Sequence, residues 1–292
     1  MKKVISLLLV VLLVASCFIG CAKNVTIECT CDCNAQADGG DATKYTQLKA
    51  NGKSGVDCST MPSDKAAILK LYNDVGNATK AAQNQKVSKT DPGAKTSISD
   101  LSTGGKPASD GTMNTVKGLV SNFAPEGVTA DYTFVNGEDA NVKDEDGNPS
   151  KLIKVIPVGG QEYMSSLTDA DISDATIEEL EDGYWKVTIT VNPTQIEFKD
   201  PNNNPPTPQA KFTGVMASGD LLKSFGPAKI THANINYKES VATAVIDPAS
   251  GYMVQLVHHM DYDMAVEGKL GFELQGTVNV KSDIIYNWTE IG

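Results

Sequence analysis

The feature that most constrains the fold is a set of β-hairpin signals in the second half of the chain. Two predicted strands, 176–181 and Trp185–Val191, flank the dipeptide Asp182-Gly183, and the second of them alternates apolar and polar residues. Asp-Gly favours a two-residue hairpin turn. A second pair, 241–247 and 252–264, flanks a four-residue turn. Strands joined by turns this short run antiparallel, so the sequence predicts an antiparallel sheet. Further strands are predicted at 129–135, 152–158, 269–275 and 277–288.

A first helix is predicted before the main run of strands, at residues 64–82. Ser63 is the expected N-cap, with Asp64 in the first turn. One face of this helix is apolar at helical spacing, through Ile68, Leu71, Tyr72, Val75 and Ala78.

A second helix is predicted from Ser109 or Asp110 to just before Pro125, which cannot continue a helix. Its apolar residues are Met113, Val116, Leu119, Val120 and Phe123. Between the two helices, segments 85–90 and 95–101 form a predicted hairpin around Asp91-Pro92-Gly93.

Helices that precede the strands, rather than alternate with them, indicate an α+β fold. No GxGxxG or GxxxxGK[ST] motif argues for a nucleotide-binding fold. We therefore predict one α+β domain at residues 63–292. It contains a curved, mainly antiparallel and half-barrel-like sheet, with the two N-terminal helices packed on one face.

The first twenty residues are typical of a bacterial export signal. Lys2 and Lys3 precede an apolar run that is too short to span a membrane. Phe18-Ile19-Gly20-Cys21 resembles a lipobox, so residues 1–20 are predicted as a lipoprotein signal peptide and Cys21 as the lipidated residue. Cys17 is the alternative, because Val14-Ala15-Ser16-Cys17 fits the same motif.

Residues 21–62 are predicted to form a lipidated, flexible tether, because they contain few large apolar residues. Lipidation at Cys21 leaves an even number of cysteines in an oxidising exterior. We expect a disulfide between Cys58 and one of the three clustered cysteines, rather than a metal site. The disulfide candidates are Cys29, Cys31, Cys33 and Cys58.

Composition excludes one class of partner. All 25 basic residues are lysines, against 36 acidic residues, and the net charge is −11. Without arginine the chain lacks the planar guanidinium group that binds phosphate through two hydrogen bonds. Its net negative charge would also be repelled by a phosphate backbone. Nucleic-acid binding is therefore not expected.

The histidines and acidic clusters do not predict a catalytic or metal site. His258 and His259 are adjacent on a predicted strand, so their side chains lie on opposite faces and cannot bind one metal ion. The acidic segments 144–148 and 169–173 lack the ligand positions of a calcium loop. Residues 144–149 are instead predicted to be a polar hairpin turn, and residues 168–172 a short helix start. No cofactor is predicted.

Several segments together resemble uncharacterised cell-surface lipoproteins of clostridial Gram-positive bacteria. They are residues 160–171, the hairpin 182–189, the helix with Leu71-Tyr72-Asn73, and segment 244–251. The order of elements also resembles, at fold level, the LolA-like and LppX-like lipoproteins that carry lipids. These resemblances imply a location at the cell surface and a curved antiparallel half-barrel with helices across its mouth.

The sequence favours a monomeric, non-catalytic binding domain on the extracytoplasmic face of the membrane, held there by its lipid anchor. The first hypothesis is a carrier for an apolar or amphipathic ligand between helices and sheet. The predicted cavity residues are Ile68, Leu71, Val116, Leu119 and Trp185. The alternative is a structural or protein-interaction module of the cell envelope, with a filled core and no small ligand.

Fractionation of expressing cells tests the anchor. Cys21→Ser should release the protein into the soluble fraction, because the acyl chains would have no attachment site. Cys17→Ser serves as the matched control and should leave the protein with the membranes. The reverse pattern would assign the lipid to Cys17.

Overall fold

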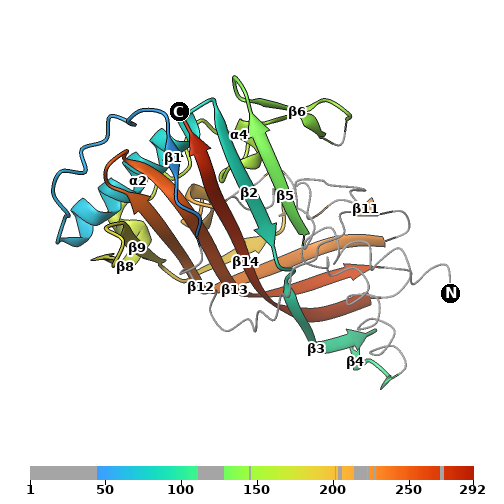
Figure 1. The fold of residues 1–292 in the computed structure, drawn as a ribbon. Helices are drawn as coiled ribbons and strands as arrows, with labels where there is room; N and C mark the ends of the chain where they lie inside the picture. Colours follow the sequence, from blue (N-terminus) through green and yellow to red (C-terminus); the bar gives the residue numbers. More distant parts are fainter. Residues whose placement is uncertain are drawn as a thin grey trace.

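The protein was analysed as a computed structural model, which describes residues 45–110, 128–144, 146–200, 202, 206–213, 222, 224–225, 228–269 and 273–292. The described residues form a 12-stranded sheet in the order β4-β3-β14-β13-β12-β9-β8 along its main path, with five further strands attached to it (Figure 1). β6 and β7 form a separate two-stranded sheet. This architecture confirms the mainly antiparallel sheet, and helices α2 and α4 accompany it.

The strands of the main path are β3 (Lys95–Thr103), β4 (Lys106–Pro107), β8 (Ile172–Glu179), β9 (Trp185–Val191), β12 (Ala228–Asp247), β13 (Tyr252–Lys269) and β14 (Glu273–Ile291). The attached strands are β1 (Lys49–Ala50), β2 (Gln85–Asp91), β5 (Val128–Phe134), β10 (Thr194–Phe198) and β11 (Ser224–Phe225). The small sheet contains β6 (Glu138–Lys143) and β7 (Pro149–Lys151).

Three long strands, β12, β13 and β14, form the centre of the sheet. They contain 20, 18 and 19 residues, and β13 pairs antiparallel with both neighbours along nearly its whole length. Gly251, with φ of +74°, closes the turn between β12 and β13. Because Lys269 pairs with Glu273 across β13 and β14, the single strand predicted at 269–275 is wrong.

The hairpin predicted between segments 85–90 and 95–101 is also wrong. β2 and β3 pair with successive parts of β14 rather than with each other: Val87 lies opposite Trp288, and Lys95 lies opposite Lys281. The Asp91 side chain accepts a hydrogen bond from the Gly93 amide in the connecting turn. β14 is longer than either strand, so the two short strands line up end to end along it.

Residues 152–158 were predicted as a strand but contain the short helix α4 (Leu152–Val155) followed by a loop. The ammonium group of Lys80 explains the difference. It donates to the backbone oxygens of Ile156, Pro157 and Val158 at 3.3, 2.7 and 3.0 Å, and to Tyr163 O at 3.2 Å. These carbonyl groups are therefore not available to a neighbouring strand.

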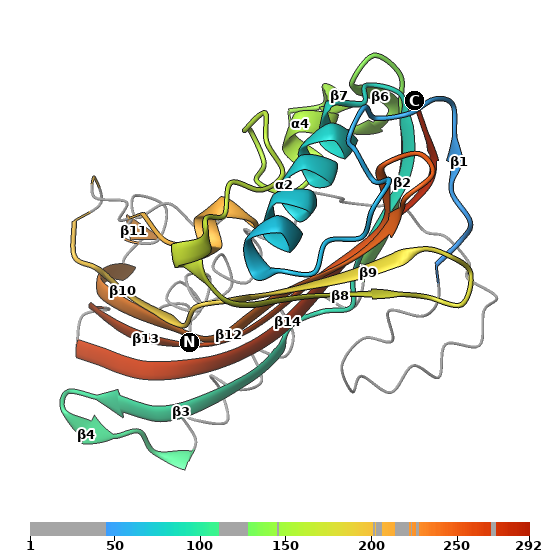
Figure 2. The same cartoon turned by 90° about the vertical axis from the view of Figure 1, so that its left-hand side faces the viewer.

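The sheet bends beneath α2 but is neither closed nor strongly curled, so the half-barrel prediction is corrected to an open sheet (Figure 2). Pairing between β12 and β13 shifts register near Ile230, Tyr237 and Val245. Such shifts increase the local twist of a strand without closing the sheet.

Helix α2 (Lys65–Ala81) confirms the first predicted helix and lies across one face of the sheet (Figure 2). Its N-cap is Asp64 rather than Ser63, because the Asp64 side chain accepts a hydrogen bond from the Ala67 amide at 2.9 Å. The second predicted helix, from Ser109 or Asp110 to just before Pro125, lies outside the described part of the chain from residue 111 onward.

Residues 45–62, predicted to be part of the flexible tether, lie against the domain. β1 pairs parallel with Glu290 and Ile291 of β14, and the Ser54 amide donates to Ser250 O at 2.8 Å. The Tyr45 hydroxyl donates to Asp182 at 2.7 Å. This segment thus crosses the end of the sheet, and the packed part of the chain reaches back to Tyr45.

The buried apolar residues form two clusters. The larger, which we call the proximal cluster, joins α2 to the sheet through residues such as Tyr72, Val75, Trp185 and Trp288. The smaller, the distal cluster, consists of Ile196, Phe198, Leu222, Ala233, Ile235, Tyr237, Met260, Tyr262, Met264, Val278 and Val280. Ten of these eleven residues belong to strands of the main sheet.

Close packing between α2 and the sheet centres on Gly76. A Cβ atom at this position would lie 3.0 Å from Met164 Cε and 3.2 Å from Met253 Cε. We expect Gly76→Val to lower the free energy of unfolding by about 1–3 kcal/mol, because it overpacks this contact. The control, Ala66→Val, places valine on the exposed side of α2. It should change the free energy of unfolding by less than about 1 kcal/mol. Urea denaturation measures the free energy of unfolding of both variants. Equal effects would show that the interface between α2 and the sheet accommodates the larger side chain without overpacking.

Candidate functional site

The predicted cavity between α2 and the sheet is a packed core where the structure describes it. Ile68, Leu71 and Trp185 are 4%, 7% and 7% exposed and belong to the proximal cluster. The other two predicted cavity residues, Val116 and Leu119, lie outside the described residues. A ligand between α2 and the sheet would have to displace these side chains.

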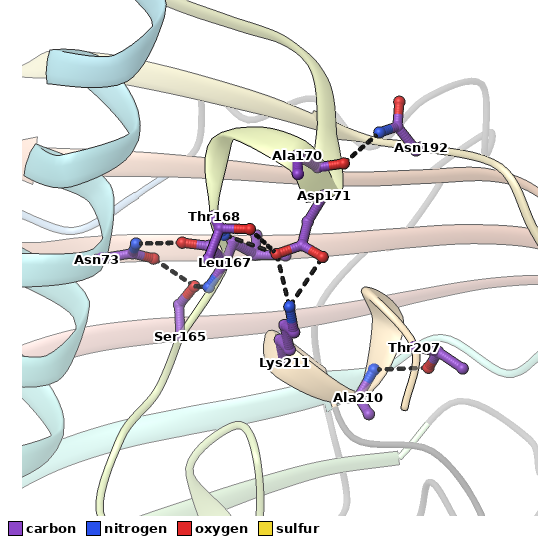
Figure 3. A network of polar contacts seen from close by, with 10 residues as sticks. All are labelled: Asn73, Ser165, Leu167, Thr168, Ala170, Asp171, Asn192, Thr207, Ala210 and Lys211. Carbon is purple, nitrogen blue, oxygen red and sulfur yellow. Dashed lines mark hydrogen bonds and ion pairs between the residues drawn. The ribbon is translucent and has the colours of Figure 1, made fainter. Parts of the chain in front are cut away.

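A polar network lies beside α2, on the same side of the sheet (Figure 3). It joins three segments: α2, the loop that leads into the 3-10 helix η1 (Asp169–Asp171), and the 3-10 helix η2 (Gln209–Lys211). The centre of the network is the ion pair between Lys211 and Asp171, in which Lys211 Nζ lies 2.9 and 2.7 Å from the two carboxylate oxygens. Backbone contact adds to it, since the Ser166 amide donates to Lys211 O at 2.9 Å.

Asp171 also closes a capping box at η1. The Thr168 amide and hydroxyl donate to Asp171 Oδ2 at 2.7 and 2.5 Å. Burial alone would raise the pKa of Asp171, but the hydrogen bonds from Lys211 and Thr168 outweigh burial and hold this pKa below its usual value. The carboxylate is therefore ionised and structural. The short helix start predicted here is confirmed.

Two asparagines of α2 hold the loop before η1. Asn77 Oδ1 accepts from the amides of Met164 and Ser165 at 2.7 and 3.0 Å. Asn73 donates to Leu167 O at 2.8 Å and accepts from the Ser165 hydroxyl at 2.5 Å. The network thus fixes η2 over the inner face of the sheet, the face that α2 covers.

A buried polar row, which we call the seam, lies where η2 meets the sheet. It consists of Gln209 of η2 and of Ser240, His258 and Ser282 of the sheet. All four are buried. Ser240, Met260 and Ser282 are directly opposite one another on β12, β13 and β14, and His258 lies two residues along β13 on the same face. Gln209 Nε2 reaches the Ser240 hydroxyl at 3.4 Å. The seam separates the proximal cluster from the distal cluster.

His258 is the residue of the seam that can carry a charge, and its environment is unusually apolar for a histidine. It is 1% exposed, and its ring meets Phe212 edge to face at a centroid distance of 4.9 Å. Burial lowers its pKa to about 3. The imidazole is therefore neutral at ordinary pH.

The opposite, outer face of the sheet carries charged cross-strand pairs. His259 Nδ1 lies 2.7 Å from Asp283, and this hydrogen bond raises the pKa of His259. Lys238 and Lys281 lie 2.9 Å from Asp263 and Asp261. The burial of His258 and the partial exposure of His259 confirm that adjacent histidines lie on opposite faces.

The structure describes one of the predicted cysteine sites. Cys58 is half-buried, and burial raises the pKa of its thiol. It forms no disulfide with another described residue. The remaining predicted positions, Cys17, Cys21, Cys29, Cys31 and Cys33, lie outside the described residues.

Within the described ranges, no group of three or more His, Cys, Asp or Glu side chains is arranged to hold a metal ion. No helix in the same part of the chain is long and apolar enough to cross a membrane. Comparison of the chain with protein-family models, with curated proteins and with solved structures found no match.

Sequence reasoning missed the seam and most of the network around it. The helix start predicted at η1 was found, and the spacing Thr168-x-x-Asp171 is a capping-box signal that marks it. No comparable signal marks Gln209 or Lys211, because they lie about thirty to fifty residues from Ser240 and His258 in the chain. Only the path of η2 over the sheet brings them together.

The low pKa of His258 predicts a pH dependence of stability. The ordinary histidine pKa of 6.5 applies to the unfolded chain. Folding favours the neutral ring, so this contribution is complete above about pH 6.5 and is lost progressively as the pH falls toward 3. At up to about 1.4 kcal/mol per pH unit, it should decrease by about 2 kcal/mol between pH 6.5 and pH 5.

Urea denaturation at pH 7 and pH 5 measures this contribution as the difference between wild type and His258→Phe. Carboxylates and the other two histidines titrate in both proteins and cancel in the comparison. The variant should lose about 2 kcal/mol less than the wild type on acidification. His232→Phe, at a partly exposed position, is the control. Equal losses in all three proteins would contradict the assignment.

Proposed function

We propose that this protein is a lipid-anchored, extracytoplasmic and non-catalytic carrier of an apolar or amphipathic ligand. The ligand chain binds over the distal cluster, rather than in the interface between α2 and the sheet. The observation that carries the proposal is the division of the inner face into two apolar clusters. One cluster is filled by α2. The other is built almost entirely from strands that α2 does not cover, and its side chains are also buried, at 0–6% exposure.

The composition of the distal cluster suits an alkyl chain. Met260 and Met264 are flexible and adapt to ligands of different shape. Tyr237 and Tyr262 contact each other at a ring-centroid distance of 5.4 Å and present large apolar faces. Burial of an alkyl chain contributes about 0.8 kcal/mol per methylene, so ten methylenes contribute about 8 kcal/mol, which is comparable with the cost of association, about 4–15 kcal/mol.

Two further features support the proposal: the predicted lipid anchor and the separate positions of the three histidines. The export signal with Cys21 supplies the anchor, and the resemblance to clostridial surface lipoproteins supports the same location. His232, His258 and His259 lie at three separate places on the sheet: His232 contacts Glu197, His258 lies in the seam, and His259 contacts Asp283. This dispersal favours binding over acid–base catalysis, and we propose no cofactor.

An envelope interaction module is the second candidate, favoured by the packed interface between α2 and the sheet. Its binding surface would be the outer face, where Lys238 and Lys281 pair with Asp261 and Asp263. Such a module needs no cavity. It would recognise a partner through this polar face and carry no lipid.

Native mass spectrometry of protein expressed with membranes, but without its own acyl anchor, tests the carrier. The wild type should retain an alkyl-chain lipid, or bind added monoolein. Val280→Trp, which fills space in the distal cluster, should reduce the bound fraction at least tenfold. Thr243→Trp on the outer face of β12 is the matched control and should bind as the wild type does. Circular dichroism checks that the variants fold.

Absence of lipid from the wild type, with no uptake of monoolein, would overturn the carrier and leave the interaction module. Equal loss of lipid in both tryptophan variants would place the ligand elsewhere than the distal cluster.

A further inference from the structure

The seam borders the distal cluster directly. Along the inner face, the row Ala242, His258, Ile284 is followed by the row Ser240, Met260, Ser282. The next row contains Tyr237, Tyr262 and Val280, which belong to the distal cluster. A chain lying over the distal cluster therefore meets polar groups at one end and apolar groups along its length.

Two buried polar atoms of the seam have no hydrogen-bond partner among the residues that the structure describes: Gln209 Oε1 and His258 Nε2. Gln209 is fully buried, and His258 is nearly so. A buried polar atom without a partner costs about 1–3 kcal/mol, and native proteins satisfy such atoms in almost every case. These two atoms therefore point to a group that hydrogen-bonds at the seam.

We propose that the seam binds the uncharged, hydroxyl-bearing end of an amphipathic ligand, such as the glycerol end of a monoacylglycerol, in preference to a carboxylate. This inference rests on the proposed carrier function. A hydroxyl group donates to the amide oxygen of Gln209, which only accepts. It also donates to or accepts from His258 Nε2, whichever tautomer is present. A carboxylate only accepts and would leave Gln209 Oε1 unsatisfied.

The charges around the seam support the same selectivity. Lys211, on the same 3-10 helix as Gln209, is already paired with both oxygens of Asp171. Lys89 lies 5.8 Å from the ring centroid of Tyr286 and lowers the pKa of Asp91 by its charge, although burial of Asp91 acts more strongly in the other direction. Each of these lysines thus has a carboxylate neighbour. An anionic ligand would compete with Asp171 or Asp91 for its cation.

The ion pair of Lys211 and Asp171 also positions Gln209. It links η2 to η1, which α2 supports through Asn73. Gln209 is therefore fixed over the sheet before any ligand arrives. Preorganised acceptors of this kind increase affinity because little side-chain freedom is lost on binding.

Competition against a fluorescent alkyl probe measures the preference. Monoolein and oleate share the same acyl chain, so their ratio of inhibition constants at pH 8 reports the headgroup alone. We expect the wild type to prefer monoolein at least tenfold. His258→Phe and, separately, Gln209→Leu should reduce this preference to threefold or less, while the probe itself still binds. His259→Phe, on the outer face, should leave the preference unchanged.

The outcomes separate the two proposals. If neither monoolein nor oleate displaces the probe, or the probe does not bind, the carrier function fails. If both bind with equal affinity, or if oleate is preferred, the carrier stands and the headgroup inference is overturned. A preference for monoolein that survives in the folded His258→Phe and Gln209→Leu proteins also overturns it. Because Gln209 lies on η2 rather than in the sheet, its variant provides a test even if His258→Phe fails to fold.

Discussion

The whole structure depends on the register of β13 between β12 and β14. Side chains alternate between the two faces of a strand, so a slip of one residue would exchange the faces. In the observed register His258, Met260 and Tyr262 lie on the inner face, and His259, Asp261 and Asp263 lie on the outer face. A slip would bury the three outer residues, two of which carry carboxylates. The cost of burying those charges fixes the register.

This register produces an inner face longer than α2 can cover. The 17 residues of α2 extend about 25 Å at 1.5 Å per residue. The 18 residues of β13 extend about 60 Å at roughly 3.3 Å per residue. α2 therefore covers only one half, where the proximal cluster forms. The distal cluster belongs to the other half, and this mismatch in length is the physical basis of the carrier proposal.

Buried polar groups near the inner face fall into two kinds. Asp171, Asn77 and Lys80 have their hydrogen bonds satisfied by nearby backbone and side chains, and they hold loops in place. Gln209 and His258 retain atoms with no partner among the described residues, at the border of the distal cluster, and the Tyr72 hydroxyl is a third such group within the proximal cluster. An unpartnered buried polar atom costs free energy, so its presence needs an explanation, and a bound polar group is one such explanation. This contrast distinguishes the seam from the network around Asp171.

The sequence by itself determined the local features: the turn at Asp182-Gly183, the amphipathic helix α2, and the opposite orientation of His258 and His259. These follow from contacts within a few residues, which periodicity and turn chemistry report. Tertiary structure alone decided the placement of β2 and β3 along β14, the loop held by Lys80, and the seam. The hydrogen bond from Trp288 to Gln85 joins residues 203 positions apart. No local pattern encodes such a pairing, because it depends on which surfaces remain available once the long strands have paired.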